Sequence, residues 1–431
     1  MKNATSVRWR ILALLTLAGF VMYILKTNMS VAGKGLMTDL GFSRIQLGVI
    51  LAALNWGYAI FQFPGGLVGD RIGARRALTL MALAWGALTL LIGLVPGRTL
   101  VPAGVTLSCL VGLQFLLGAT QAPFYPVTSG GTTAAWFPVA GWALPNGLSN
   151  AGLTLGIAAT GPLVAWIMER LGWRQAFVLT APAAFAVAAW WWWYARDSPG
   201  EHAKVNAAEL ALIGHGRPEV DFRRAAGTPA LWRRLLRDRN VLLLTASYFC
   251  DCYVFYLFSN WLFLYLVDGR GIPVLRAGFY SSVPWLCAAG TAVAGGFLCD
   301  ALSKRIGLRG GCRWTAAGAM LAAAAFVGAG AAVAGPLAAV VFVSLALASQ
   351  QFADAAYWAA TISISGRHAS AACGVLNTGG NAVGGVVALV VPFLVQSFGW
   401  GVALGSGAAF ALASALLWAG IRADEPLSEA S

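Results

Sequence analysis

The sequence predicts an all-α membrane protein with twelve transmembrane helices, arranged as two parallel six-helix pseudo-repeats. Its mean hydropathy is +0.72 and only 10% of its residues are charged, whereas charged residues make up about a quarter of a typical soluble protein. Runs of about twenty apolar residues recur along the chain, and each is long enough to cross about 30 Å of hydrocarbon. The predicted spans lie near residues 11–32, 46–68, 77–96, 105–127, 144–168, 175–195, 241–266, 279–299, 315–334, 337–361, 372–396 and 400–421.

A repeated motif divides the chain into two equivalent halves. The pattern Gly-x-x-Asn-x-Gly surrounds Asn150 and again Asn377, 227 residues later, and the same distance separates the Gly-Trp pairs at Trp173 and Trp400. Repeats of this kind are common in secondary transporters. The spacing predicts a first bundle over residues 1–195, a cytoplasmic linker over 196–240 and a second bundle over 241–431. Residues 207–213 of the linker are expected to form a short amphipathic helix at the membrane surface.

The basic residues predict the orientation in the membrane. Arg71, Arg75 and Arg76 follow the second span, and Lys304 and Arg305 follow the eighth, all on the side of the N-terminus. Because short cytoplasmic loops carry the excess of Lys and Arg, both termini are predicted to be cytoplasmic. The net charge of +13 is therefore a topology signal and not a nucleic-acid site. The first apolar run is too long for a signal-peptide core, so we expect a multi-pass, monomeric protein of the bacterial inner membrane.

A glycine- and arginine-rich segment follows the second span. It reads Gly66-Leu-Val-Gly-Asp70-Arg71-Ile-Gly73-Ala-Arg75-Arg76 and resembles the loop signature of the major facilitator superfamily. Its glycines permit a tight turn, and an aspartate at a helix end can bind arginines and interact with a helix dipole. We expect these residues, together with a shorter copy after the eighth span, to latch the two halves in one conformational state; the alternative is that the charges only anchor the topology. The predicted latch comprises Gly66, Asp70, Arg71, Gly73, Arg75, Arg76, Asp300 and Arg305.

The resemblance continues nearly end to end with the anion:cation symporter branch of that superfamily. The residues that carry it include Tyr23-Ile-Leu-Lys26-Thr-Asn28-Met-Ser30-Val-Ala32 in span one, Trp56-Gly-Tyr58 and Gln62-Phe-Pro64-Gly65-Gly66 in span two, and Trp136-Phe137-Pro138 after span four. The resemblance implies the fold of that superfamily and a transporter that moves a small organic anion, such as a sugar acid, by alternating access. It also implies a co-transported cation, expected to be H⁺.

Two departures from the family's pattern concern the coupling ion. The family commonly has an acid before the span-one cation and a glutamate in span four, where this chain has Leu25 and Gln121. Neither side chain can ionise, so proton symport would need another titratable group. The resemblance therefore leaves open the coupling ion, the direction of transport and the substrate itself.

Lys26 is the most informative single residue. A lysine inside a span is costly and usually faces a cavity, a counter-charge or a ligand, although it can also extend its ammonium group to the membrane surface. The family's anion-binding arginine aligns with Lys26, which implies that Lys26 binds the substrate carboxylate. Lysine lacks the bidentate fork of arginine, so neighbouring side chains must orient that carboxylate. The predicted neighbours are Tyr23, Tyr58, Asn150, Trp358 and Asn377.

Two carboxylates are predicted well within the hydrocarbon. Asp251 lies in span seven and Asp354 in span ten, both near mid-depth. A low dielectric favours the neutral form of a carboxyl group, so either could bind and release a proton near neutral pH. The alternatives are hydrogen bonding to nearby hydroxyls or binding of a substrate cation.

The sequence contains no zinc-protease motif, nucleophile elbow or Walker phosphate loop, so we expect neither an enzyme nor a bound cofactor or metal. Three rival functions remain. They are a proton-coupled exporter of drugs or siderophores, an uncoupled anion exchanger, and a membrane sensor that does not transport.

Overall fold

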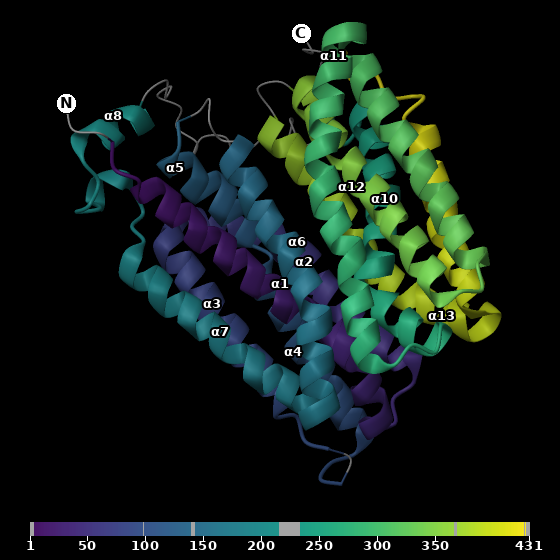
Figure 1. The fold of residues 1–431 in the computed structure, drawn as a ribbon. Coiled ribbons are helices and arrows are strands. Elements are labelled where there is room, and N and C mark those ends of the chain that lie inside the picture. Colours follow the sequence, from purple (N-terminus) through teal and green to yellow (C-terminus); the bar gives the residue numbers. More distant parts are fainter. Residues whose placement is uncertain are drawn as a thin grey trace.

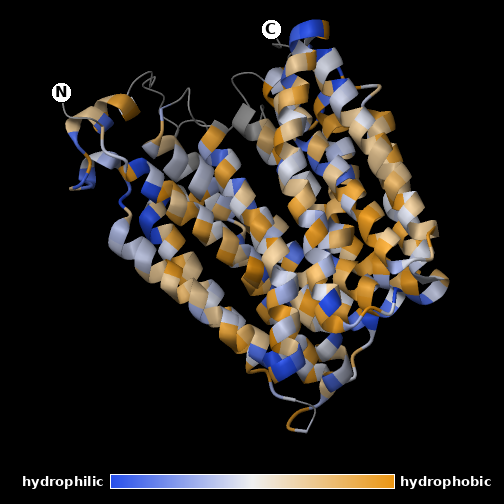
Figure 2. Ribbon diagram, in the orientation of Figure 1, coloured by the Kyte–Doolittle hydropathy of each residue, from blue (hydrophilic) through white to orange (hydrophobic). Residues whose placement is uncertain are grey.

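The long helices account for nearly all of the chain. The computed structural model describes residues 4–97, 99–138, 143–214, 233–365, 369–425 and 427. The first bundle contains α1 (Val7–Leu40), α2 (Arg44–Ile72), α3 (Ala74–Gly93), α4 (Ala103–Gln121), α6 (Ala143–Leu171) and α7 (Trp173–Tyr194), with the π-helix η1 (Pro126–Thr133) and the short α5 (Ala134–Trp136) after α4. The second bundle contains α10 (Arg239–Leu264), the π-helix η5 (Tyr265–Gly269), α11 (Val274–Ala332), α12 (Pro336–Ser365) and α13 (Ala369–Leu417). Apolar residues dominate these helices (Figure 2).

Ten helices of the described chain are long and apolar enough to cross a membrane, and two of them contain two spans each. The backbone leaves the helical region at Ile306 and Gly307 within α11, and at Gly399 within α13. Gly307 and Gly399 have φ of 79° and 81°, a conformation that glycine adopts without the steric cost of a side chain. The twelve predicted spans and the all-α fold class are therefore confirmed.

Corresponding glycines pack the two halves in the same way. A Cβ atom at Gly152 would lie 2.6 Å from the Thr16 carbonyl oxygen, and one at Gly379 would lie 2.5 Å from Cγ2 of Thr245. These glycines therefore let α6 approach α1 in the first bundle and α13 approach α10 in the second. The repeated motif thus marks equivalent helix contacts in the two halves.

The two bundles meet at the side opposite the chain termini, here called the outer side (Figure 1). Near the outer end of α6, a Cβ atom at Gly161 would lie 2.5 Å from the Gly278 carbonyl oxygen of α11. Beside this contact, the Ser282 hydroxyl donates a hydrogen bond to the Ala158 carbonyl. The bundles diverge toward the termini in Figure 1. The structure is therefore closed at its outer side.

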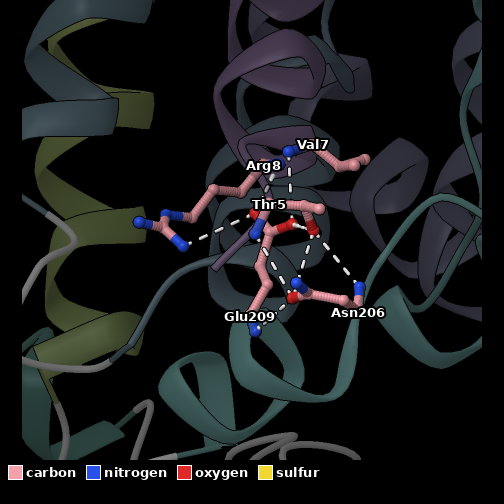
Figure 3. A network of polar contacts seen from close by, with 5 residues as sticks. All are labelled: Thr5, Val7, Arg8, Asn206 and Glu209. Atoms are coloured by element: carbon pink, nitrogen blue, oxygen red, sulfur yellow. Dashed lines mark hydrogen bonds and ion pairs between the residues drawn. The ribbon is translucent and has the colours of Figure 1, made fainter. Parts of the chain in front are cut away.

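The linker helix α8 (Ala207–Gly214) packs on the beginning of α1 (Figure 3). The Glu209 side chain is fully buried and accepts hydrogen bonds from the backbone N–H groups of Val7 and Arg8 and from the Thr5 hydroxyl. The N-cap residue Ser6 makes no side-chain capping bond, so Glu209 supplies the acceptors that the first turn of α1 needs. The predicted helix is confirmed, and its place at the membrane surface stays a prediction.

Candidate functional site

Lys26 lies inside a group of three tyrosine rings. Its Nζ atom is 3.8 Å from the ring centre of Tyr58 on α2, 5.0 Å from that of Tyr23 on α1 and 5.9 Å from that of Tyr256 on α10. The lysine is only 8% exposed, and it makes no ion pair with a carboxylate in the described parts of the chain. Cation–π contacts of this kind contribute about 0.5–2 kcal/mol each. The ammonium group is thus partly stabilised but lacks a counter-charge.

A chain of amide and hydroxyl groups crosses between the bundles beside this lysine. Tyr256 Oη donates to the Asn381 side-chain oxygen at 2.7 Å, and Asn381 Nδ2 donates to Gln62 of α2 at 3.1 Å. Asn381 Nδ2 also lies within hydrogen-bond distance of the Asn377 carbonyl and side-chain oxygens, at 2.9 and 3.1 Å. These groups can both donate and accept hydrogen bonds, so they can rearrange around a hydroxylated ligand.

The two intramembrane carboxylates lie on α10 and α12, which are neighbouring helices of the second bundle. Asp251 of α10 is fully buried and accepts one hydrogen bond at 2.6 Å from Gln350 Nε2, while its second oxygen has no partner among the described residues. Asp354 of α12 is partly exposed and accepts a hydrogen bond at 3.0 Å from Trp358 Nε1. Asp354 is therefore less enclosed by the protein than Asp251 in this conformation.

Leu25 and Gln121, which stand where the family usually has acids, are both buried inside the first bundle. Leu25 is 1% exposed and belongs to the apolar core. Gln121 is fully buried, and its Nε2 donates to the Met22 carbonyl of α1 at 3.4 Å. Its side-chain oxygen has no partner in the part of the chain that the structure describes. The amide therefore faces the helix that carries Lys26, where a glutamate would have supplied a negative charge.

The remaining predicted neighbours of Lys26 are placed differently from one another. Asn377 joins the polar chain through Asn381, whereas Trp358 lies with Asp354, its ring 5.9 Å from that of Tyr248. The Asn150 side chain is exposed and makes no hydrogen bond with the described residues. The structure therefore brings Tyr23, Tyr58 and the Asn377 network to Lys26, and places Trp358 with the carboxylates.

The predicted latch residues of the first bundle surround the turn between α2 and α3. Gly73 has φ of 86°, and a Cβ atom there would lie 2.9 Å from the Asp197 carboxylate oxygens. The same carboxylate accepts the backbone N–H of Arg75, whose guanidinium donates to the Trp192 carbonyl and lies 4.2 Å from the Trp192 ring centre. In this outer-closed state Arg75 thus holds α3 and α7 of one bundle together.

The other latch residues have fewer contacts. A Cβ atom at Gly66 would lie 3.1 Å from Pro126, so this glycine lets α2 approach η1. Arg71, Arg76, Asp300 and Arg305 are exposed. The Asp70 backbone is helical, and its side chain lies outside the described part of the structure. Latching between the halves stays a prediction, because the structure shows them separated at this side.

Sequence reasoning missed Tyr256, Gln62 and Asn381. One signal was available. Asp300 follows Asp70 by 230 residues, close to the 227-residue repeat of the asparagine motif, and Tyr256 follows Lys26 by the same 230 residues. Asn381 lies one helical turn after Asn377, on the same face of α13. Within the described residues, no group of three or more His, Cys, Asp or Glu side chains could hold a metal ion.

Comparison with known proteins agrees with this architecture. Residues 15–389 match the family model described as Major Facilitator Superfamily. A protein named as a probable sulfoacetate transporter from Cupriavidus necator is 31% identical over 409 residues, covering 93% of this chain and 90% of its own length. The D-galactonate transporter of Escherichia coli is 28% identical over 418 residues, covering 95% of this chain and 94% of its own length.

The fold also matches solved structures. The crystal structure of a D-xylose-proton symporter superposes with a TM-score of 0.74 at 14% sequence identity, covering 97% of this chain and 99% of that one. Twelve spans in two equivalent bundles, with a buried polar site between them, define a multi-pass membrane transporter. The chain belongs to the Major Facilitator Superfamily.

Proposed function

We propose that this protein is a secondary transporter of a small organic anion, with Lys26 as the residue that binds the anion's carboxylate group. The observation that carries the proposal is the buried ammonium group of Lys26, which contacts three tyrosine rings and lacks a carboxylate partner in the described chain. A buried charge is strongly destabilising unless it is paired. A carboxylate ligand would supply the missing charge, and the relatives are named as carriers of such anions.

The surrounding groups fit a hydroxylated acid. Tyr23 and Tyr58, whose rings contact the ammonium group, and the polar chain through Asn377 and Asn381 offer hydrogen-bond donors and acceptors to such a ligand. The Asn381–Gln62 hydrogen bond joins the two bundles. A ligand that competes for these groups would therefore change a contact between the bundles. We assign Tyr23, Tyr58 and Asn377 to the wall of this site, and we keep Asn150 and Trp358, which lie outside the group around Lys26, as proposed further contacts of the substrate.

Proton coupling is assigned to the second bundle. Asp354 exchanges the proton, because it is partly exposed, and the buried Asp251 lies on the neighbouring helix of the same bundle. Lys26 belongs to the first bundle, so the anion and the proton would bind to residues of different bundles. The boundaries 1–195, 196–240 and 241–431, a monomeric state, cytoplasmic termini and a bacterial inner membrane complete the proposal. In the inward-closed state the bundles would be latched by the eight residues Gly66, Asp70, Arg71, Gly73, Arg75, Arg76, Asp300 and Arg305.

Uptake into proteoliposomes tests the function. Radiolabelled sulfoacetate, D-galactonate and D-glucarate are presented with and without an imposed pH gradient, and we expect saturable, gradient-stimulated uptake of at least one. Uptake that ignores proton and sodium gradients would indicate the uncoupled exchanger. A protein that carries none of these acids but extrudes drugs or siderophores would be the exporter, and one that carries nothing would be the sensor.

A further inference from the structure

Two cations of the first bundle share one carboxylate of the second bundle at the outer side. Lys34 Nζ lies 2.6 Å from one oxygen of Asp268, and Arg44 Nη2 lies 3.0 Å from the other. The Asp268 side chain is only 8% exposed, whereas those of Lys34 and Arg44 are 37% and 40% exposed. Each oxygen of a single carboxylate is therefore bound by a different cation.

Both cations belong to the first bundle, whereas the carboxylate that they share belongs to the second. Lys34 lies on α1, and Arg44 is the first residue of α2, whose start is fixed by a capping box between Ser43 and Gln46. Asp268 lies in η5 of the second bundle. Because both cations belong to the first bundle, a separation of the outer ends of the bundles would remove Asp268 from both of them.

The local charge is unbalanced in favour of an anion. Two positive groups face one negative group, and Arg44 Nε is buried without a hydrogen-bond partner among the residues that the structure describes. Asp39, another acid near this end of α1, is already bound by Arg174 and by the Trp173 indole N–H. Electropositive surfaces of this kind raise the local concentration of anions and accelerate their association.

We propose that Lys34 and Arg44 form a capture site for the carboxylate of an organic anion, which Asp268 occupies while the outer side is closed. This inference rests on the proposed anion transport. Asp268 shows that the pair accepts a carboxylate, and the anion replaces it when the bundles part. Lys26 lies eight residues deeper on the same helix, about 12 Å away at 1.5 Å per residue. Return of Asp268 to the cations after the anion has moved inward closes the outer side.

Two opposite perturbations distinguish capture from simple gating. Asp268→Asn and the double variant Lys34→Gln/Arg44→Gln both remove the ion pairs, so a simple gate predicts changes in KM of the same sign. Capture predicts that, for substrate added at the outer side, KM rises in the double variant and does not rise in Asp268→Asn. The double variant should raise KM by about 2- to 30-fold, since partly exposed charge pairs contribute about 0.2–1 kcal/mol each. Asp268→Asn should lower KM or leave it unchanged, because it frees the site.

The assay uses full-length protein in oriented proteoliposomes, with whichever of sulfoacetate, D-galactonate and D-glucarate the unmodified protein carries. The double variant Arg170→Gln/Arg276→Gln removes the same charge from exposed positions near the outer ends of α6 and α11 and serves as the control. The single variants Lys34→Gln and Arg44→Gln should each give a smaller increase in KM, which keeps the test valid if the double variant does not fold.

The expected result is a higher KM only for the variants that remove Lys34 or Arg44, and a smaller dependence of KM on salt in the double variant. A KM that moves in the same direction for Asp268→Asn and for the double variant would overturn the capture site while leaving anion transport in place. An equal increase in the control would show that only the general surface charge matters. Absence of transport of all three acids would overturn both the capture site and the proposed function.

Discussion

Replacing Lys26 with an uncharged residue should weaken transport without lowering the stability of the fold. The lysine is 8% exposed and has no carboxylate partner in the described chain, and its Nζ atom lies 3.8 Å from the centre of the Tyr58 ring. A hydrogen bond to a charged group contributes about 1.5–3 kcal/mol. Since about 1.4 kcal/mol corresponds to a tenfold change in affinity, Lys26→Gln should weaken anion binding by about 10- to 150-fold. Lys26→Arg keeps the charge and should retain part of the uptake.

Replacing Lys26 with an uncharged residue should not destabilise the protein. The side chain loses cation–π contacts of about 0.5–2 kcal/mol each, but the fold no longer carries the desolvation cost of an unpaired buried charge, which amounts to several kcal/mol. Lys26→Met should therefore unfold at the same temperature as the unmodified protein or at a higher one. Saturable counterflow in proteoliposomes measures the affinity, and intrinsic tryptophan fluorescence during heating of detergent-solubilised protein measures the stability.

A matched control is available in Lys304, which is exposed. Lys304→Gln removes the same charge and should change neither the affinity nor the unfolding temperature. The reasoning would be refuted by a Lys26→Gln variant with unchanged affinity, because the ammonium group would then not touch the anion. It would also be refuted by a Lys26→Met variant that unfolds several degrees lower, since the lysine would then stabilise the fold.

Three further predictions follow from the coupling, the outer contact and the linker. Asp354→Asn should abolish substrate accumulation driven by a pH gradient while preserving counterflow exchange. Asp251→Asn should weaken accumulation and counterflow alike, because it alters the contact with Gln350. If the two variants still accumulate substrate, the carboxylates do not carry the proton. Gly161→Ala should hinder outer closure, because its Cβ atom would lie 2.5 Å from a carbonyl oxygen of α11; cysteine labelling at the outer side should increase, and unchanged labelling would contradict this. Glu209→Gln should lower the unfolding temperature, because a carboxylate that binds backbone N–H groups at a helix start contributes about 0.5–2 kcal/mol; an unaltered melting curve would count against the capping role.

The parts of the structure that follow from local sequence were predictable. The spans appear as long apolar runs, and Lys26, Asp251 and Asp354 stand out because a charge within such a run is costly. The helices extend beyond the predicted spans, as α1 does to Leu40, because a helix continues through the polar interface after its apolar stretch ends. Hydropathy marks where the hydrocarbon ends and contains no information on where the helix ends.

The polar chain between the bundles was not predictable in the same way. Gln62 and Asn381 are separated by 319 positions, and an uncharged amide in a span resembles a packing residue until its partner is known. The π-helix η1 also gave no periodic signal, because its glycines and threonines are compatible with an ordinary helix. Contacts between distant segments depend on how the two bundles pack against each other, and that packing cannot be predicted from the local pattern of a single sequence.

Because Glu209 contacts the start of α1, the linker helix α8 belongs with the first bundle when the chain is divided for protein engineering. Hydropathy alone would divide the chain at residue 195, directly after α7. The carboxylate of Glu209, however, completes the first turn of a helix that begins two hundred residues earlier. A split protein made for co-expression of the two bundles should therefore keep residues up to Gly214 on the first fragment, and a fusion partner inserted before α8 would separate α1 from its cap.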